Sequence, residues 1–152
     1  MSKFSLIFLS SFLVITSLFS FLNIIYSYYF KLSLNINIYY INLVVSGVIG
    51  FTFYKIENSE KKPSIFEKIF TVLLGYLLLP LVLSIPLYLS IYNLTFLNAY
   101  FETVSGFTST GFTIFENIKH IDQGSILWRS SIQWLGGLYF LYSIIFLIDI
   151  YD

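Results

Sequence analysis

The sequence contains no cysteine, a single histidine and few charged residues. Without cysteine it can form no disulfide framework, thiolate metal site or cysteine nucleophile. Charged residues make up 11% of the chain, whereas an ordinary soluble domain carries about 25%. The single His120 and the scattered acids have no recognisable metal-ligand spacing, and a net charge of zero argues against a nucleic-acid partner. These shortages predict a chain without cofactor or metal cluster that does not bind nucleic acid.

Apolar residues are in large excess. Of the 152 residues 57% are hydrophobic and 21% aromatic, and the mean hydropathy is +0.82. A water-soluble core of this size could not bury so much apolar surface, so we expect lipid to surround the chain. We also expect no enzyme, because the apolar segments hold no nucleophile–base pair.

Four apolar segments are candidates to cross a membrane as helices: Phe4–Phe30, Ile38–Tyr54, Ser64 to about Ser90, and Ser125–Ile150. The first begins like a signal peptide, but its length and the lack of a small-residue cleavage site favour a retained helix. Gly47 and Gly50 would allow close helix packing in the second. The sequence therefore predicts an all-α integral membrane protein with four transmembrane helices.

Prolines and lysines refine this topology. Pro63 suits a helix start, whereas Pro80 and Pro86 lie inside the third segment and need neighbours that bond the freed carbonyls. A cytoplasmic N-terminus would place most lysines inside, as the positive-inside rule favours; the inner set is Lys3, Lys55, Lys61, Lys62 and Lys68, and the outer set Lys31, Lys119 and Arg129.

Between the third and fourth segments lies the stretch GFTSTGF, residues 106–112. It follows a short apolar helix, Phe96–Ser105, which the Thr95 hydroxyl can cap. At 1.5 Å per residue this helix is too short to cross a core about 30 Å thick. It must lie on the surface or dip in and return, so GFTSTGF is either an ordinary exposed loop or a stretch that lines a cavity.

A dipping segment would suit a cation filter. Successive carbonyls of an extended chain can replace the hydration shell of an ion, and the C-terminal end of the helix dipole favours positive charge. Gly111 can adopt a positive φ angle and leaves room for an ion. The hydroxyls of Thr108, Ser109 and Thr110 can add oxygens or brace the loop.

Two motifs carry a resemblance. Residues 101–112, FETVSGFTSTGF, resemble the first pore loop of the TrkH/KtrB potassium-uptake family, and residues 127–137, LWRSSIQWLGG, resemble the start of its following inner helix. The resemblance implies a re-entrant pore helix and an extended filter loop between the third and fourth spans. It divides the chain into an N-terminal helix pair (1–56), a cytoplasmic linker (57–63) and a helix–pore-loop–helix unit (64–152).

Carried over to this chain, the resemblance implies a filter at Thr108, Ser109, Thr110, Gly111 and Phe112. K⁺, the transported ion, would be held by the backbone carbonyls of Ser109, Thr110 and Gly111, and glycine at position 111 favours potassium. Family members more commonly have threonine at the position of Ser109. Many TrkH proteins have a smaller residue at the position of Phe112, which is closer to the KtrB pattern. The residues expected to support the pore are Glu102, Ser105, Gly106, Arg129 and Gln133.

Individual side chains leave alternatives open. Glu102 either braces the pore helix or lies in the wetted outer interface, and Arg129 either anchors the interface or turns towards the pore loop. His120 and Asp122 are expected to be solvated. Trp128 and Trp134 are expected to be packing or interfacial aromatics.

Family members carry four such units around one pore, whereas this chain contains one. We therefore expect the first part of a transporter in the bacterial inner membrane, truncated or split. Its partners would be the remaining pore units and a cytosolic nucleotide-binding ring. A homotetramer and a non-transporting remnant or assembly protein are the alternatives.

Overall fold

The computed structural model describes residues 6–56, 64–118 and 121–148. Within these ranges it is all-helical, with five helices and no strand: α1 (Leu6–Tyr29), α2 (Ile36–Ile56), α3 (Ile65–Ser90), α4 (Phe96–Phe107) and α5 (Gln123–Ile148). All of these but α4 are long and apolar enough to cross a membrane, which confirms the four predicted spans. The expected linker 57–63, Lys3, Lys61, Lys62, Lys119 and His120 lie outside the described residues.

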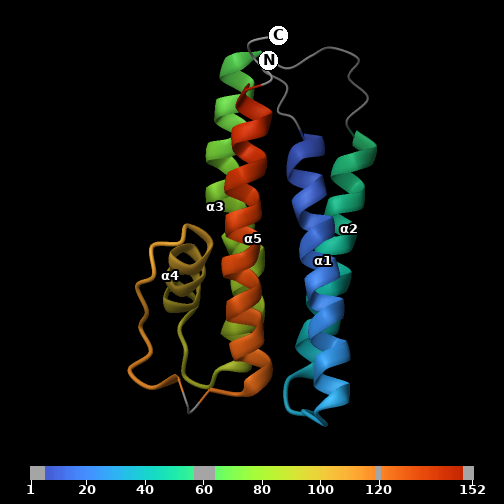
Figure 1. Ribbon diagram of the computed structural model, residues 1–152. Helices are drawn as coiled ribbons and strands as arrows, with labels where there is room; N and C mark the ends of the chain where they lie inside the picture. The colour runs from blue at the N-terminus through green and yellow to red at the C-terminus, as the bar shows by residue number, and fades with distance from the viewer. Residues whose placement is uncertain (1–5, 57–63, 119–120, 149–152) are drawn as a thin grey trace.

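The helices form two groups that stand side by side (Figure 1). α1 and α2 make an antiparallel hairpin, and α3 and α5 make an antiparallel pair next to it. α4 lies against α3 and α5, and its connections to both lead to the end of the bundle opposite the start of α1 (Figure 1). The short helix is therefore placed beside the α3–α5 pair rather than within the hairpin.

Small and hydroxyl residues hold the hairpin together. The Ser10 hydroxyl donates to the Gly50 carbonyl at 2.8 Å, and the Ser17 hydroxyl donates to the Leu43 carbonyl at 3.1 Å. A methyl group at Gly50 would lie 3.1 Å from the Leu13 Cβ, closer than side-chain carbons normally pack. The predicted use of Gly50 for close helix packing is confirmed.

α3 begins close to the expected start near Ser64, but with a capping box that was not expected. Ser64 and Glu67 form a capping box, in which the Ser64 backbone donates to the Glu67 carboxylate at 2.9 Å. The helix runs through both internal prolines, and neighbours bond the carbonyl three residues before each. Tyr100 donates its hydroxyl to Leu77 at 3.1 Å, and Trp128 donates its indole N–H to Leu83 at 3.0 Å. Side chains from α4 and α5 thus bond the carbonyls adjacent to those that the two prolines leave without a helical donor.

Tyr139 joins the two groups of helices. Its side chain is fully buried, and its hydroxyl donates to the Val72 carbonyl at 2.8 Å. Its ring lies 4.8 Å from that of Phe12 in α1 and 5.3 Å from that of Phe107 in α4. This one aromatic side chain of α5 therefore touches α1, α3 and α4.

Gly136 lets the C-terminal end of α4 approach α5. A methyl group at this position would collide with the backbone carbonyl of Phe107, whereas a methyl group at Gly137 would meet nothing within 4 Å. Backbone cannot move aside as a flexible side chain can, so the close approach requires glycine at position 136.

We predict that Gly136→Ala lowers the free energy of unfolding by about 1–3 kcal/mol, the usual cost of overpacking. The matched control Gly137→Ala should change it by less than about 0.5 kcal/mol. Reversible SDS unfolding followed by circular dichroism measures both. Equal stabilities for the two variants would contradict the proposed contact.

Candidate functional site

α4 and the segment after it form the candidate site. Thr95 caps the helix, as predicted, by accepting a hydrogen bond from the Asn98 N–H at 3.3 Å. The helix ends at Phe107, two residues later than expected, so Gly106 and Phe107 are its last helical residues. A methyl group at Gly106 would make only ordinary contacts, so close packing does not explain this glycine. We call residues 108–115, which follow α4, the return segment.

The helix is terminated by a Schellman motif. The Ser109 N–H donates to the Gly106 carbonyl at 3.2 Å, and the Thr110 N–H donates to the Ser105 carbonyl at 3.0 Å. Such a motif needs a left-handed residue after the cap, usually glycine. Here Ser109 takes that place with φ 57°, a conformation that the sequence did not lead us to expect.

These hydrogen bonds fix the direction of the backbone carbonyls that follow α4. In a planar trans peptide the N–H and the C=O point in opposite directions, and no described peptide is cis. The Thr110 N–H faces Ser105 at 3.0 Å and the Gly111 N–H faces it at 3.5 Å. The carbonyls of Ser109 and Thr110, which belong to the same two peptides, therefore point away from α4.

Phe112 has the opposite orientation. Its carbonyl accepts a hydrogen bond from the buried Ser105 hydroxyl at 2.6 Å, so it points towards α4. Ser105 thus contacts the return segment with its own carbonyl and with its side chain. Phe112 is thus a predicted filter residue whose carbonyl is directed into the protein.

Gly111 lies between the outward-pointing carbonyl of Thr110 and the inward-pointing carbonyl of Phe112, with φ 82°, a positive angle that glycine can adopt. A Cβ atom at this position would meet nothing within 4 Å, so glycine serves the backbone conformation and not close packing. All five predicted filter residues, 108–112, are exposed in the single chain. One face of the return segment is therefore open.

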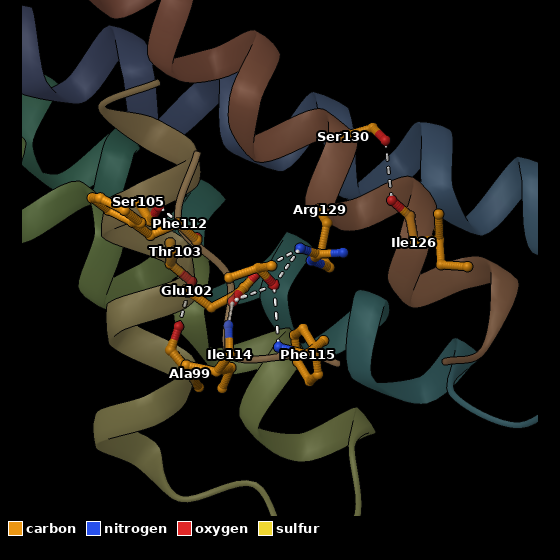
Figure 2. A network of polar contacts seen from close by, with 11 residues as sticks. Ala99, Glu102, Thr103, Ser105, Phe112, Ile114, Phe115, Ile126, Arg129 and Ser130 are labelled. Atoms are coloured by element: carbon orange, nitrogen blue, oxygen red, sulfur yellow. Dashed lines mark hydrogen bonds and ion pairs between the residues drawn. The ribbon is translucent and has the colours of Figure 1, made fainter. Parts of the chain in front are cut away.

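The Glu102 carboxylate is the centre of a polar network behind this segment (Figure 2). It forms an ion pair with Arg129 of α5, and it accepts hydrogen bonds from the Thr113 hydroxyl at 3.0 Å and the Ile114 N–H at 3.0 Å. Only 4% of the Glu102 side chain and 14% of the Arg129 side chain are exposed. One carboxylate thus links α4, the return segment and α5.

Arg129 and Gln133 complete this side of the site. The Arg129 guanidinium lies 5.1 Å from the centre of the Phe115 ring and 3.2 Å from the Thr113 hydroxyl. A crevice of about 240 Å³ opens between α4, the return segment and α5. Its lining includes Glu102, Gly106, Gly111, Phe112, Arg129 and Gln133. The predicted supporting residues therefore lie around one crevice, with Ser105 among them.

Several contacts were not expected from the sequence. Thr113, Ile114 and Phe115 reach Glu102 or Arg129 across more than ten residues of chain, and no local pattern marks them. Asp122 is not merely solvated, because its carboxylate accepts from the Gly124 N–H at 3.1 Å and caps α5. An aspartate directly before an apolar helix could have revealed this role.

The two tryptophans differ. Trp128 is fully buried and bonded to α3, so it packs inside the bundle. Trp134 is 68% exposed.

Among the described residues no group of three or more His, Cys, Asp or Glu side chains could hold a metal ion.

The fold and the site define a multi-pass helical membrane protein. Its sequence is 47% identical over 55 residues to the Trk system potassium uptake protein TrkI of Halomonas elongata. It is 28% identical over 103 residues to TrkG of Escherichia coli and 29% identical over 102 residues to an uncharacterized cation transporter of Methanocaldococcus jannaschii. The chain is therefore a relative of the Trk potassium uptake proteins, and the predicted resemblance is confirmed.

These matches cover part of each protein. They include 36% of this chain for TrkI, 66% for TrkG and 65% for the archaeal transporter. They span only 11%, 21% and 22% of the lengths of those relatives. No family model and no solved structure matches the chain. The relatives are transport proteins rather than enzymes, in agreement with the expectation from the sequence.

We predict that Arg129→Met lowers the free energy of unfolding by about 3 kcal/mol, because it leaves a buried carboxylate unpaired. Combining it with Glu102→Gln should cost less than the sum of the two single variants, since the pair is then removed as a unit. Lys31→Met, at an exposed lysine, is the control. If the changes in the free energy of unfolding of the two single variants add up to that of the double variant, the ion pair contributes nothing to stability.

We predict that Ser105→Ala releases the Phe112 carbonyl at a cost of about 1 kcal/mol. Solid-state NMR with ¹³C-carbonyl phenylalanine and ¹⁵N-threonine selects Phe–Thr pairs, including Phe112–Thr113, whose carbonyl signal should move upfield. Ser130→Ala removes a hydroxyl bonded only within α5 and should leave the signal in place. An unmoved signal in Ser105→Ala would contradict the assigned hydrogen bond.

Proposed function

We propose that this chain forms one wall of a transmembrane pathway for potassium. In this proposal α4 is a re-entrant pore helix, residues 64–152 are one helix–pore-loop–helix unit, and the return segment contains the ion filter. The observation that carries the proposal is that the Ser109 and Thr110 carbonyls point away from α4, in a segment whose residues 108–112 are exposed. Carbonyl oxygens presented in this way can replace the hydration shell of a cation.

The proposed ligands are the backbone carbonyls of Ser109, Thr110 and Gly111. Phe112 then ends the filter, because its carbonyl is bonded to Ser105. Glu102 has a bracing role, since Arg129 and Ile114 engage its carboxylate and leave it behind the return segment. The potassium preference rests on the glycine at position 111 and on the similarity to Trk potassium uptake proteins.

The open side of the return segment implies partners. One unit presents a single row of carbonyls, and unsatisfied backbone groups in hydrocarbon cost several kcal/mol each. We propose that further pore units complete the ring, which makes this chain one part of a truncated or split Trk-type subunit. Four copies of the chain are the alternative assembly, and a cytosolic nucleotide-binding ring is a proposed regulatory partner. If α4 stayed at the membrane surface instead, the chain would be a non-transporting protein.

We propose a bacterial inner-membrane location with the N-terminus in the cytoplasm. Lys55 in the last turn of α2 and Lys68 in the first turn of α3 lie at the end of the bundle where α1 begins. The positive-inside rule favours this end as the cytoplasmic one. α4 would then enter from the opposite side.

The proposed function is tested by growth at low potassium of bacteria that lack their own potassium uptake. The chain is expressed alone and together with E. coli TrkG from which the matching fifth has been removed. We expect growth only with both proteins, because the truncated relative supplies the missing walls. Growth with the chain alone would favour the homotetramer.

The control in this experiment is Gly111→Ser. At φ 82° a serine side chain strains the backbone, so the variant should reduce potassium-dependent growth in whichever combination supports it. Immunoblotting of membrane fractions checks that both forms are inserted. If Gly111→Ser leaves growth unchanged, the proposal that the return segment contains the filter is wrong.

A further inference from the structure

The crevice between α4, the return segment and α5 has polar side chains on its α5 side. Arg129 and Gln133 are four residues apart, so they lie on the same face of that helix, and both line the crevice. The rest of the lining includes Gly106 of α4 and Gly111 of the return segment. Two polar side chains therefore share this space with two residues that have no side chain.

Most hydrogen-bonding groups of these two side chains have no partner in the described part of the chain. A guanidinium has five N–H donors, and Arg129 uses only its Nη2 atom, which donates to Glu102 and to the Thr113 hydroxyl. Its Nε and Nη1 atoms and the Gln133 amide make no hydrogen bond to a described residue. Because only 14% of the Arg129 side chain is exposed, its remaining donors need partners at this depth.

Gly106 keeps room in the crevice. A Cβ atom at this position would lie 3.4 Å from Cγ2 of Ile132 and 3.6 Å from Cγ of Gln133. Both of these residues line the crevice, so a larger side chain at position 106 would occupy part of it. The crevice measures about 240 Å³, whereas about 10–15 Å³ is enough to hold one water molecule. There is thus space for several small molecules next to the unused donors.

We propose that this crevice binds water molecules, which accept hydrogen bonds from Nε and Nη1 of Arg129 and bond both the NH₂ group and the oxygen of the Gln133 amide. Water can donate and accept, as this mixture of groups requires. An ion fits less well, because the charges of Glu102 and Arg129 already balance each other. A cation would be repelled by the guanidinium and an anion by the carboxylate. A lipid chain would leave the donors unbonded.

Bound water would hydrate the return segment from the side of α5. Gly111 lines the crevice, and a Cβ atom there would meet nothing within 4 Å. The Glu102 network would then support the segment at Thr113 and Ile114, and water would support it at Gly111. This inference does not depend on potassium transport, because it concerns bound water and not the passage of an ion.

Water-edited solid-state NMR of the chain in lipid bilayers tests the proposal, because it measures how fast magnetisation passes from water to each N–H group. Arg129 is the only arginine of the chain, so ¹⁵N-arginine labelling observes its guanidinium alone. We expect its Nε–H to receive magnetisation several-fold faster than the ¹⁵N-labelled indole of Trp128, which is fully buried and bonded to Leu83. Trp134→Phe identifies the Trp128 signal. Equally slow transfer to both groups would overturn the proposal.

A matched pair of variants separates water in the crevice from water at the outer surface. Gly106→Leu places a side chain in the crevice and should lower the transfer rate at Arg129 several-fold. Gly137→Leu adds the same side chain to α5 outside the crevice, where a Cβ atom meets nothing within 4 Å, and should leave the rate unchanged. Slow transfer to Trp128 in both variants checks that the helices remain packed.

Gly106→Ala gives a milder version of the same test. Its added methyl group makes only ordinary contacts, so the fold should be kept and the Arg129 rate should fall by less than in Gly106→Leu. An unchanged or higher Arg129 rate in both Gly106 variants would mean that water reaches Arg129 without the crevice and would also overturn the proposal.

Discussion

The ion pair between Glu102 and Arg129 sets the geometry on which the candidate site depends. A carboxylate in a membrane protein is costly to bury and is stable only when it is paired and hydrogen-bonded. Here the carboxylate meets one guanidinium, one hydroxyl and one backbone N–H. These groups come from α5 and the return segment. The hydrogen bonds that they donate to the Glu102 carboxylate therefore hold α5 and the return segment in place against α4.

One turn of α5 extends this constraint to the other helices. Trp128 bonds the α3 backbone, Arg129 pairs with α4, and Ser131 lies against Asn23 of α1. Arg129 points to a different side of the helix from Trp128 and Ser131, as a period of 3.6 residues requires. The same turn therefore contacts the hairpin, the helix interrupted by prolines and the candidate site.

Local patterns predicted the parts of the structure that depend on neighbouring residues. The spans followed from apolar length, the cap at Thr95 from a hydroxyl residue before a helix, and the ability of Gly111 to adopt a positive φ from its lack of a side chain. The capping box at Ser64 was not expected. The contacts of Ile114 and of Asn23 could not be predicted, because they join segments far apart in the sequence. The left-handed Ser109 was missed because serine rarely adopts that angle, and the motif that imposes it is defined by hydrogen bonds back to α4.

The position of α4 along the bundle has an electrical consequence. In Figure 1 α4 lies beside the part of α3 and α5 that is farther from the start of α1. If the return segment is the narrowest part of the pore proposed above and water fills the rest of the path, most of the membrane potential falls across the few residues near Gly111. With about 2.3 kcal/mol per unit charge for each 100 mV, the field on a potassium ion would be concentrated where the Ser109 and Thr110 carbonyls point.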